Sequence, residues 1–241
     1  MADKFKAIND KDINAKKSYI AIVLDKSGSM LDHKQTTISG FNEQVQTIKK
    51  NATNDTYVSL VLFNDSIEIP FFNSNVSSLN EMNEKTYNPD ASTSLYDAVG
   101  KILDRFKKET DWENENNIYL ISIITDGEEN SSKEYKNKQI AKMIKELQDT
   151  KRWTFTYLGP NNVNLTKINK ELNIELGNMK AYVDSTDGRY LALHMHSQCL
   201  ASYMNNSKNS NVKCSNNFYL DSNANDLLER KEVKDEDLQQ V

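Results

Sequence analysis

The sequence predicts an α/β domain built on a doubly wound, mostly parallel central sheet, with helices on both faces and one antiparallel edge strand. Short apolar runs rich in β-branched residues alternate along the chain with amphipathic segments of helical period. This alternation is typical of βαβ units, in which a helix connects two parallel strands. The chain has 241 residues, enough for one large α/β domain with a tail.

The apolar runs define the predicted strands. Residues 18–25 and 117–125 carry nearly uninterrupted apolar stretches, which indicates strands buried on both faces. The other predicted strands cover residues 57–63, 67–69, 153–158 and 180–183. We expect 67–69 to form a hairpin with the strand before it, because Pro70 restricts this short run to a sheet edge.

Amphipathic segments define the predicted helices. Over residues 36–50 the apolar side chains recur every three or four positions, which predicts a helix with one buried face. The same pattern predicts four more helices, over residues 95–108, 133–149, 163–172 and 187–204. Residues 71–90 lack this pattern and are predicted to form a loop with one helical turn near 79–84.

The expected organisation is one domain between two polar segments. Residues 1–17 form a polar lead-in, and residues 18–204 contain all the predicted strands and helices. Residues 205–241 form a polar tail that is rich in Asn and Ser and ends in a highly charged stretch. Such a composition indicates either a short exposed helix or disorder.

Composition excludes several classes of protein. The formal net charge is -5 and no basic stripe is present, which argues against binding to nucleic acid. No apolar run approaches the ~18 residues of a membrane span, and the polar start of the chain lacks the apolar core of a secretory signal. We therefore expect no membrane partner and a cytoplasmic location, or association with a virion if the gene is phage-borne. The two cysteines are too few for a disulfide framework.

Hydroxyl and acidic residues follow three of the predicted boundaries. Asp25, Ser27 and Ser29 come directly after the first strand. Thr93 precedes the helix that begins near residue 95, and Asp126 follows the strand over 117–125. Because the carboxyl ends of neighbouring parallel strands meet at one edge of a sheet, we expect these residues to converge. Glu128 and Glu129 lie close by in the sequence and are expected to be surface charges.

The convergent residues have the chemistry of a site for a hard divalent cation. Mg²⁺ prefers oxygen ligands in near-octahedral geometry and usually keeps several waters. Two carboxylates and three neutral hydroxyls leave such an ion with much of its positive charge. The site would therefore seek one more anionic oxygen, such as a carboxylate of a partner protein.

The three motifs resemble those of the von Willebrand factor type A (vWA) domain. They read Asp25-Lys26-Ser27-Gly28-Ser29-Met30, Thr93-Ser94-Leu95-Tyr96-Asp97-Ala98 and Ile124-Thr125-Asp126-Gly127. The resemblance covers about residues 18–204 and implies a Rossmann-like fold with a metal-ion-dependent adhesion site (MIDAS). It implies that the site residues are Asp25, Ser27, Ser29, Thr93 and Asp126, with the serines touching the metal and the aspartates acting largely through water.

The resemblance implies a non-enzymatic module that binds Mg²⁺ or Mn²⁺ and captures an Asp or Glu of a partner protein. Two further stretches, Ile38–Asn42 and Trp153–Gly159, resemble an intracellular bacterial and phage subset of the family. An alternative is a structural or assembly component, for example a phage-borne one, that uses the fold for contacts alone.

Enzymatic functions are less favoured by the residues. A phosphohydrolase of the haloacid-dehalogenase type needs a second acid two positions after its nucleophile, and Ser27 stands there. A serine hydrolase would carry Gly-x-Ser-x-Gly, which neither Ser27 nor Ser29 matches. A zinc site at His194, His196 and Cys199 is also disfavoured, because the two histidines point to different faces of a helix.

Overall fold

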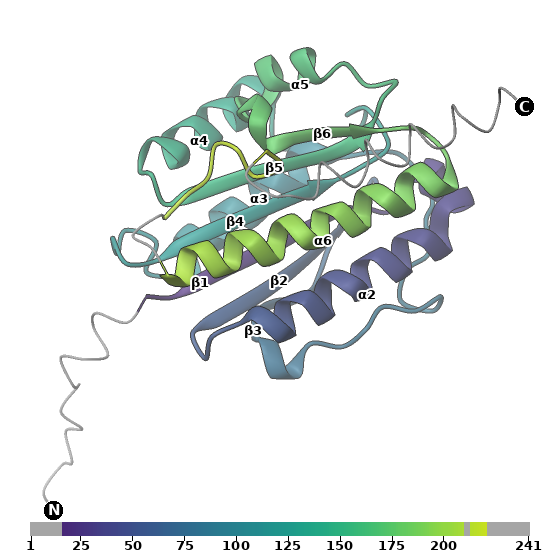
Figure 1. The fold of residues 1–241 in the computed structure, drawn as a ribbon. Coiled ribbons are helices and arrows are strands. Elements are labelled where there is room, and N and C mark those ends of the chain that lie inside the picture. The colour runs from purple at the N-terminus through teal and green to yellow at the C-terminus, as the bar shows by residue number, and fades with distance from the viewer. Residues whose placement is uncertain (1–15, 210–212, 221–241) are drawn as a thin grey trace, which may run out of the picture.

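Six strands form a single sheet in the computed structural model, which describes residues 16–209 and 213–220. Their order across the sheet is β3-β2-β1-β4-β5-β6 (Figure 1). The strands are β1 (Ser18–Asp25), β2 (Thr56–Phe63), β3 (Ile67–Asn75), β4 (Ile118–Ile124), β5 (Trp153–Pro160) and β6 (Met179–Tyr182). Neighbouring strands are parallel except β2 and β3, which are antiparallel. The predicted mostly parallel sheet with one antiparallel edge strand is therefore confirmed.

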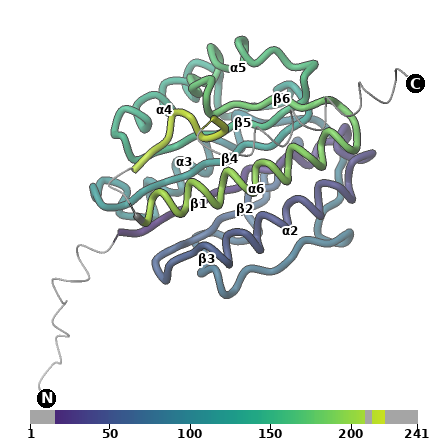
Figure 2. Tube along the Cα trace, in the orientation of Figure 1, coloured from purple at the N-terminus to yellow at the C-terminus, as the bar shows by residue number. Residues whose placement is uncertain are grey.

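Five α-helices in the described part of the chain cover the two faces of this sheet. On one face, α2 (Lys34–Asn51) and α6 (Thr186–Asn209) lie side by side (Figure 1, Figure 2). The opposite face is covered by α3 (Leu95–Glu109), α4 (Asn137–Asp149) and α5 (Leu165–Leu172). Three short 3-10 segments are η1 (Gly28–His33), η2 (Val76–Ser78) and η3 (Leu176–Asn178). The predicted doubly wound arrangement is confirmed.

The first strand lies in the middle of the sheet and is buried on both sides. Ile20, Ile22 and Leu24 pack into the core beneath α2 and α6. Tyr19 and Val23 point the other way and pack beneath α3 and α4. Successive side chains of a strand point to opposite faces, so a strand covered on both sides is apolar throughout.

The edge strand β3 is longer than predicted, because it continues beyond Pro70. Glu68 pairs with Leu62, and Phe71 pairs with Leu60. The stretch between these pairs contains one residue more on β3 than on β2, which places Pro70 at an irregularity in the ladder. Edge strands and bulges are where a sheet tolerates proline. The expected end of the strand at residue 69 is therefore wrong.

One helix begins later than predicted because a distant carboxylate holds the chain before it. The Asp97 side chain on α3 accepts the backbone N–H groups of Lys133, Glu134 and Tyr135 over 2.8–3.0 Å. These bonds keep the segment in a loop, so α4 begins at residue 137 and not at 133. Residues 79–84, predicted as a helical turn, are irregular.

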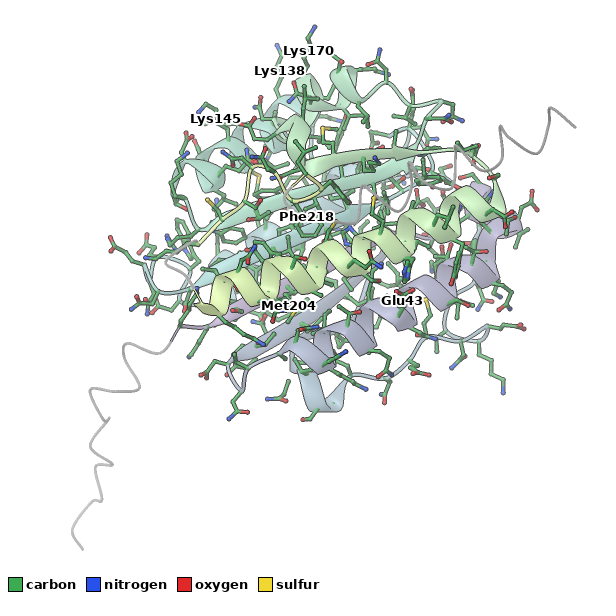
Figure 3. All side chains as sticks on the ribbon, viewed as in Figure 1. Glu43, Lys138, Lys145, Lys170, Met204 and Phe218 are labelled. Atoms are coloured by element: carbon green, nitrogen blue, oxygen red, sulfur yellow. The ribbon has the colours of Figure 1, made fainter. Side chains whose placement is uncertain are left out.

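The chain returns to the sheet after α6. This helix runs to Asn209, so the boundary expected at residue 204 falls inside it. Beyond the helix, Phe218 and Tyr219 are 3% and 1% exposed and join the core between α6 and the sheet (Figure 3). Residues 1–15 of the expected lead-in and 221–241 of the expected tail lie outside the described residues. None of the described helices combines the length and apolarity needed to cross a bilayer.

Candidate metal centre

The register of β1 and β4 places two polar residues side by side at the carboxyl edge of the sheet. Leu24 and Ile124 are partners in this parallel pair, so Asp25 and Thr125 follow at the same level. The Thr125 hydroxyl donates a hydrogen bond to Asp25 Oδ2 over 2.5 Å. This edge lies at the right of Figure 1, where α2 and α6 begin. The strand order reverses between these two strands, which is where open α/β sheets bind ligands.

The turn after β1 brings the first motif together and joins it to the second. The Ser27 N–H donates to Asp25 Oδ1 over 2.7 Å, and the hydroxyl oxygens of Ser27 and Ser29 lie 3.1 Å apart. The Gly28 N–H donates to the carbonyl of Ala91 over 3.0 Å, and a Cβ on Gly28 would lie 3.4 Å from that oxygen. The loop before α3 therefore lies in van der Waals contact with the turn.

The third motif closes the cluster. The Ser29 hydroxyl donates to Asp126 Oδ1 over 2.6 Å. A Cβ on Gly127 would lie 3.0 Å from Thr93 Oγ1, and 3.8 Å from both Asp25 Oδ2 and Ser29 Oγ. Gly127 therefore marks the point where the three motifs meet. The structure gathers around this point all five residues singled out in the sequence, which are Asp25, Ser27, Ser29, Thr93 and Asp126.

The five site residues differ in solvent exposure, from the fully buried floor of the site to its exposed mouth. Asp25 has no exposed surface, and Ser27 and Thr93 are 2% and 3% exposed. Ser29 is exposed, and Asp126 is partly buried. Burial raises the pKa of Asp25 to about 6, although hydrogen bonds from its neighbours oppose the rise. A carboxylate in such a place is stabilised by any cation bound beside it.

Two residues that the sequence did not single out hold the site in place. The buried Tyr87 hydroxyl donates to the backbone carbonyl of Asp25 over 2.6 Å. On α6, Arg189 donates from Nη2 to Asp126 Oδ2 over 3.1 Å, and its side chain is 3% exposed. Neither residue stands in a recognisable local pattern. Only the tertiary structure shows that they belong to the site.

A loop ordered by Glu129 supports the third motif. Its carboxylate accepts the N–H of Tyr96 over 2.9 Å and the N–H of Ser131 over 3.0 Å. Glu129 therefore ties the start of α3 to the loop after β4, and it is more than the surface charge that the sequence suggested. Glu128 is exposed and lies 3.3 Å from the Lys167 ammonium, as a surface charge would.

Other groups of titratable side chains do not form a competing metal site. His194 Nδ1 lies 2.7 Å from a Glu43 carboxylate oxygen, whereas His196 Nδ1 lies 2.8 Å from the Tyr219 hydroxyl. The two histidines therefore have separate partners on separate sides of α6. Across residues 16–209 and 213–220, no three His, Cys, Asp or Glu side chains are grouped as ion ligands. An ion at the carboxyl edge would thus depend on the hydroxyls.

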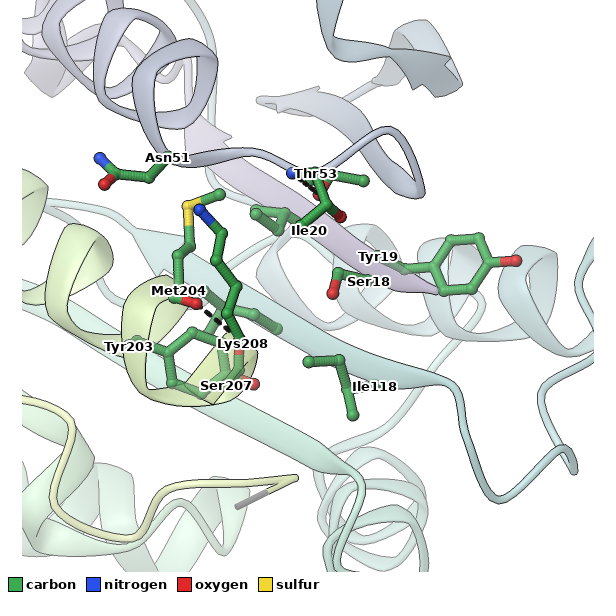
Figure 4. Close-up of a pocket in the computed structure, with 12 residues that line it drawn as sticks. Ser18, Tyr19, Ile20, Asn51, Thr53, Ile118, Tyr203, Met204, Ser207 and Lys208 are labelled. Carbon is green, nitrogen blue, oxygen red and sulfur yellow. Dashed lines mark hydrogen bonds between the residues drawn. The ribbon is translucent and has the colours of Figure 1, made fainter. Parts of the chain in front are cut away.

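Two cavities lie away from this edge. One of about 20 Å³ is lined by Ser18 at the amino end of β1 and by Ser207 near the end of α6 (Figure 4). This volume is about that of a single water. The second, of about 130 Å³, is lined in part by Cys199 and Cys214. None of the five site residues lines either cavity.

The donor set fits Mg²⁺ or Mn²⁺. It consists of three hydroxyls and two carboxylates, and hard divalent cations prefer such oxygen ligands. The negative charge of Asp126 also raises the pKa of Asp25, so the two carboxylates repel one another. A divalent cation bound between them would relieve that repulsion. The residues present therefore suit the ion that the sequence suggested.

Comparisons with known proteins agree with this architecture. The family model for the von Willebrand factor type A domain matches residues 20–187. A pilus adhesin, SpaC from Lactobacillus rhamnosus GG in an open conformation, aligns with a TM-score of 0.55 at 13% identity over 79% of this chain and 31% of that chain. The manganese-loaded TRAP protein of Plasmodium vivax aligns with a TM-score of 0.53 at 16% identity, covering 74% of this chain and 72% of that one.

A third solved structure, the ArnB paralog VWA2 from Sulfolobus acidocaldarius, aligns with a TM-score of 0.50 at 14% identity. The alignment covers 75% of this chain and 45% of that one. The chain thus spans less than half the length of two of these three proteins. At such low identity the likeness shows the fold alone. No curated protein matches the sequence.

Proposed function

The chain belongs to the von Willebrand factor type A family, and from that premise we propose that it is a non-enzymatic, Mg²⁺- or Mn²⁺-dependent protein-binding module. The ion would be held by Asp25, Ser27, Ser29, Thr93 and Asp126, and would capture an Asp or Glu side chain of a partner protein. When bound, the ion supplies a coordination position that is open to an external carboxylate. Domains of this family typically serve adhesion and protein binding, and they are usually non-catalytic.

The observation that carries the proposal is the meeting of the three motifs at Gly127. A Cβ there would touch Thr93 Oγ1 at 3.0 Å and approach the Asp25 and Ser29 side chains to 3.8 Å. Neutral hydroxyls dominate this set of donors. Because the aspartates would act largely through water, the direct ligands of the ion would carry little charge, which favours an anionic oxygen from a partner.

Exposed apolar side chains beside the site support a protein partner. Leu31, Val183 and Tyr190 are 57%, 56% and 52% exposed. They belong to three segments that meet next to the cluster, because Arg189 Nη1 lies 3.1 Å from Met30 Sδ and Gly188 packs against the carbonyl of Val183. Apolar and aromatic residues around a polar centre are typical of protein interfaces.

Two proteins of similar structure have properties of the kind proposed here, adhesion and a bound divalent ion. SpaC is described as a pilus adhesin, and TRAP was solved with manganese bound. The same fold thus serves adhesion in one of these proteins and holds a divalent ion in the other. Because their identity to this chain is low, the main support for metal binding comes from the donor set of the chain itself.

The first experiment measures thermal unfolding of the full chain in EDTA, in millimolar Mg²⁺ and in Mn²⁺. We expect both ions to raise the melting temperature of the wild type, and Asp25→Ala to remove that effect. Identical melting curves with EDTA and with Mg²⁺ would contradict the metal-binding part of the proposal.

The second experiment tests capture of a carboxylate. A displayed peptide library is selected on the wild type in Mg²⁺, and each selected peptide is compared with a copy in which Asp and Glu are replaced by Asn and Gln. We expect binding that is lost in EDTA, in the amide copies and in Asp25→Ala. Binding that survives all three changes would favour the alternative, a structural component that uses the fold for contacts alone.

Phosphoester hydrolysis is not expected. The residue two positions after Asp25 is Ser27, which is 2% exposed and cannot serve as the second acid of a phosphohydrolase. We expect no Mg²⁺-dependent turnover of generic phosphate esters. Activity that disappears in Asp25→Asn would overturn the non-enzymatic assignment.

A further inference from the structure

We propose that Arg189 is a built-in counter-ion of the candidate metal centre, which pairs with Asp126 and thereby weakens binding of the divalent ion. Arg189 lies on α6, outside the three motifs that supply the ion's ligands. The inference rests on the proposed function, because it concerns how tightly this site holds its ion.

The guanidinium of Arg189 is fixed from several sides. Nη2 donates to Asp126 Oδ2 over 3.1 Å, and Nη1 lies 3.1 Å from Met30 Sδ. The guanidinium carbon lies 5.2 Å from the centre of the Tyr182 ring, and Asp184 Oδ1 lies 3.8 Å from Nη2. The Arg189 side chain is 3% exposed and that of Asp126 is 6% exposed. The pair is therefore nearly withdrawn from solvent.

The position of Arg189 is unfavourable without Asp126. It lies in the first turn of α6, where the helix dipole disfavours a cation. Its Nε has no hydrogen-bond partner in the described part of the chain. Burial of a charged group costs desolvation free energy unless a well-placed partner of opposite charge offsets it. The strongest contact that holds the guanidinium here is the one to a carboxylate of the ion's own donor set.

Counting charges shows the consequence for the ion. Asp25 and Asp126 are the two carboxylates of the cluster, and Arg189 neutralises one of them. The nearby Lys26 ammonium is paired with Glu68 over 2.5 Å and points to β3. Asp25, Asp126 and Arg189 together carry a net charge of about -1, where the two carboxylates alone would give about -2. The Asp184 carboxylate, 3.8 Å from Nη2, is 43% exposed and is not part of the donor set. A like charge a few ångströms from an ion weakens its binding strongly in a partly buried site.

The pairing also gives Asp126 a full set of partners within the protein. Asp126 has both carboxylate oxygens satisfied, by the Ser29 hydroxyl and by Arg189. The same pairing leaves a bound ion less neutralised by the protein and more dependent on a carboxylate from the partner. Arg189 thus couples occupancy of the site to the presence of a partner.

The test uses the full chain with Arg189→Met, which keeps much of the side-chain volume and removes the charge. Mn²⁺ binding is measured by calorimetry, and melting is followed in EDTA and in saturating Mn²⁺. We expect Arg189→Met to bind Mn²⁺ at least about tenfold more tightly than the wild type, because a competing cation is gone. The variant should melt below the wild type in EDTA and show a larger Mn²⁺-induced shift.

Two further variants separate charge from structure. Arg189→Lys keeps the positive charge and should bind Mn²⁺ less tightly than Arg189→Met. In an Asp126→Asn background, Arg189→Met should still tighten Mn²⁺ binding, because a positive charge is removed from beside the ion. The factor should differ from that in the wild-type background, and the difference measures the competition for Asp126. If Arg189→Met is poorly folded, Arg189→Gln replaces it, since the amide can still donate to Asp126.

The outcomes distinguish this inference from the proposed function. Equal or weaker Mn²⁺ binding by folded Arg189→Met and Arg189→Gln overturns the counter-ion role, while binding by the wild type leaves the proposed function standing. Binding by Arg189→Met alone supports the counter-ion role and overturns metal dependence of the wild type. No binding by any of these proteins overturns both.

Discussion

Thr125 donates its hydroxyl to Asp25 Oδ2 over 2.5 Å and so joins two residues that are 100 positions apart in the chain. The bond exists because β1 and β4 are adjacent and in register, with Leu24 opposite Ile124. Burial raises the pKa of Asp25 to about 6, and the Thr125 hydroxyl is the first of the groups that hold this pKa down. Thr125 therefore keeps a buried carboxylate available as an anion.

Thr125→Val tests this relationship, because valine has the same shape but no donor. We expect the variant to lose about 2 kcal/mol of unfolding free energy, which is typical for a hydrogen bond to a charged group. Mg²⁺ binding should also weaken, because a proton competes better for Asp25. Urea denaturation in EDTA and a Mg²⁺ titration measure the two effects. Thr125→Ser keeps the hydroxyl, so equal losses in both variants would show that the methyl group, and not the bond, matters.

Asp25→Asn separates the charge of this residue from its shape. The amide oxygen can still accept from the Ser27 N–H, and the amide NH₂ can donate to the Thr125 hydroxyl. Burial raises the pKa of Asp25 from 3.8 to about 6, so ionisation above pH 6 costs folding free energy that the unfolded chain does not incur. We therefore expect the metal-free variant to be more stable than the wild type at pH 7.5, by up to roughly 3 kcal/mol.

The same variant should gain nothing from Mg²⁺, because the ion no longer meets a charged Asp25. Thermal melting of both proteins with EDTA and with Mg²⁺ gives the four values required. A lower melting temperature for Asp25→Asn in EDTA would show that the carboxylate stabilises the fold by itself. An unchanged Mg²⁺ shift would remove Asp25 from the metal site.

Ser29→Ala tests a ligand that lies at the mouth of the site. Its hydroxyl contacts Ser27 and Asp126 but is exposed, so stability should change by no more than about 0.5 kcal/mol. Mn²⁺ affinity should fall roughly tenfold, because one direct oxygen ligand is lost. Ser39→Ala, at an exposed position on α2, is the matched control and should change neither quantity. Calorimetric titration with Mn²⁺ would refute the ligand role if both variants bound alike.

The central part of this fold and site was predictable from local pattern. β1 and β4 are apolar throughout because both of their faces are buried. Their carboxyl ends lie together because parallel strands joined by helices share a direction. Asp25 and Asp126 therefore converge in any sheet of this class in which the two strands are neighbours. No knowledge of side-chain packing is needed to predict that convergence.

Features set by long-range contacts were not predictable in this way. Asp97 delays the start of α4 by binding three N–H groups more than 30 positions away, and no local signal marks that role. Arg189 resembles any charged residue of an amphipathic helix until Asp126 is placed beside it. Phe218 and Tyr219 belong to an apolar run of only three residues, 218–220, in a polar stretch, which is too short to predict a buried segment.

Phe218→Ala tests whether the segment after α6 stabilises the domain. The Phe218 ring lies 5.3 Å from that of His196 and 5.9 Å from that of Tyr203, and its N–H donates to Asn178 Oδ1 over 2.8 Å. Removal of a buried aromatic ring costs about 3 kcal/mol or more. Leu220→Ala is the control, because Leu220 is 64% exposed and should change stability little. Similar urea midpoints for Phe218→Ala and the wild type would show that the segment is a dispensable appendage.

His196 should make the stability of the domain depend on pH. Its ring has no exposed surface, its Nδ1 lies 2.8 Å from the Tyr219 hydroxyl, and burial lowers its pKa from 6.5 to about 4. The folded protein therefore keeps the ring neutral between these values, whereas the unfolded chain takes up a proton below pH 6.5. The stability present above pH 6.5 is lost as the pH falls towards 4, by about 2.5 kcal/mol at pH 4.5.

His196→Gln isolates this effect from the titration of the carboxylates, because glutamine does not titrate and can still hydrogen-bond to Tyr219. The wild type and the variant are unfolded in urea at pH 7.5, 6.0, 5.0 and 4.5. We expect acid to destabilise the wild type more than His196→Gln, so that the difference in unfolding free energy shifts by about 2.5 kcal/mol in favour of the variant between the extremes. A difference that stays constant with pH would mean that the folded protein protonates His196 as readily as the unfolded chain does.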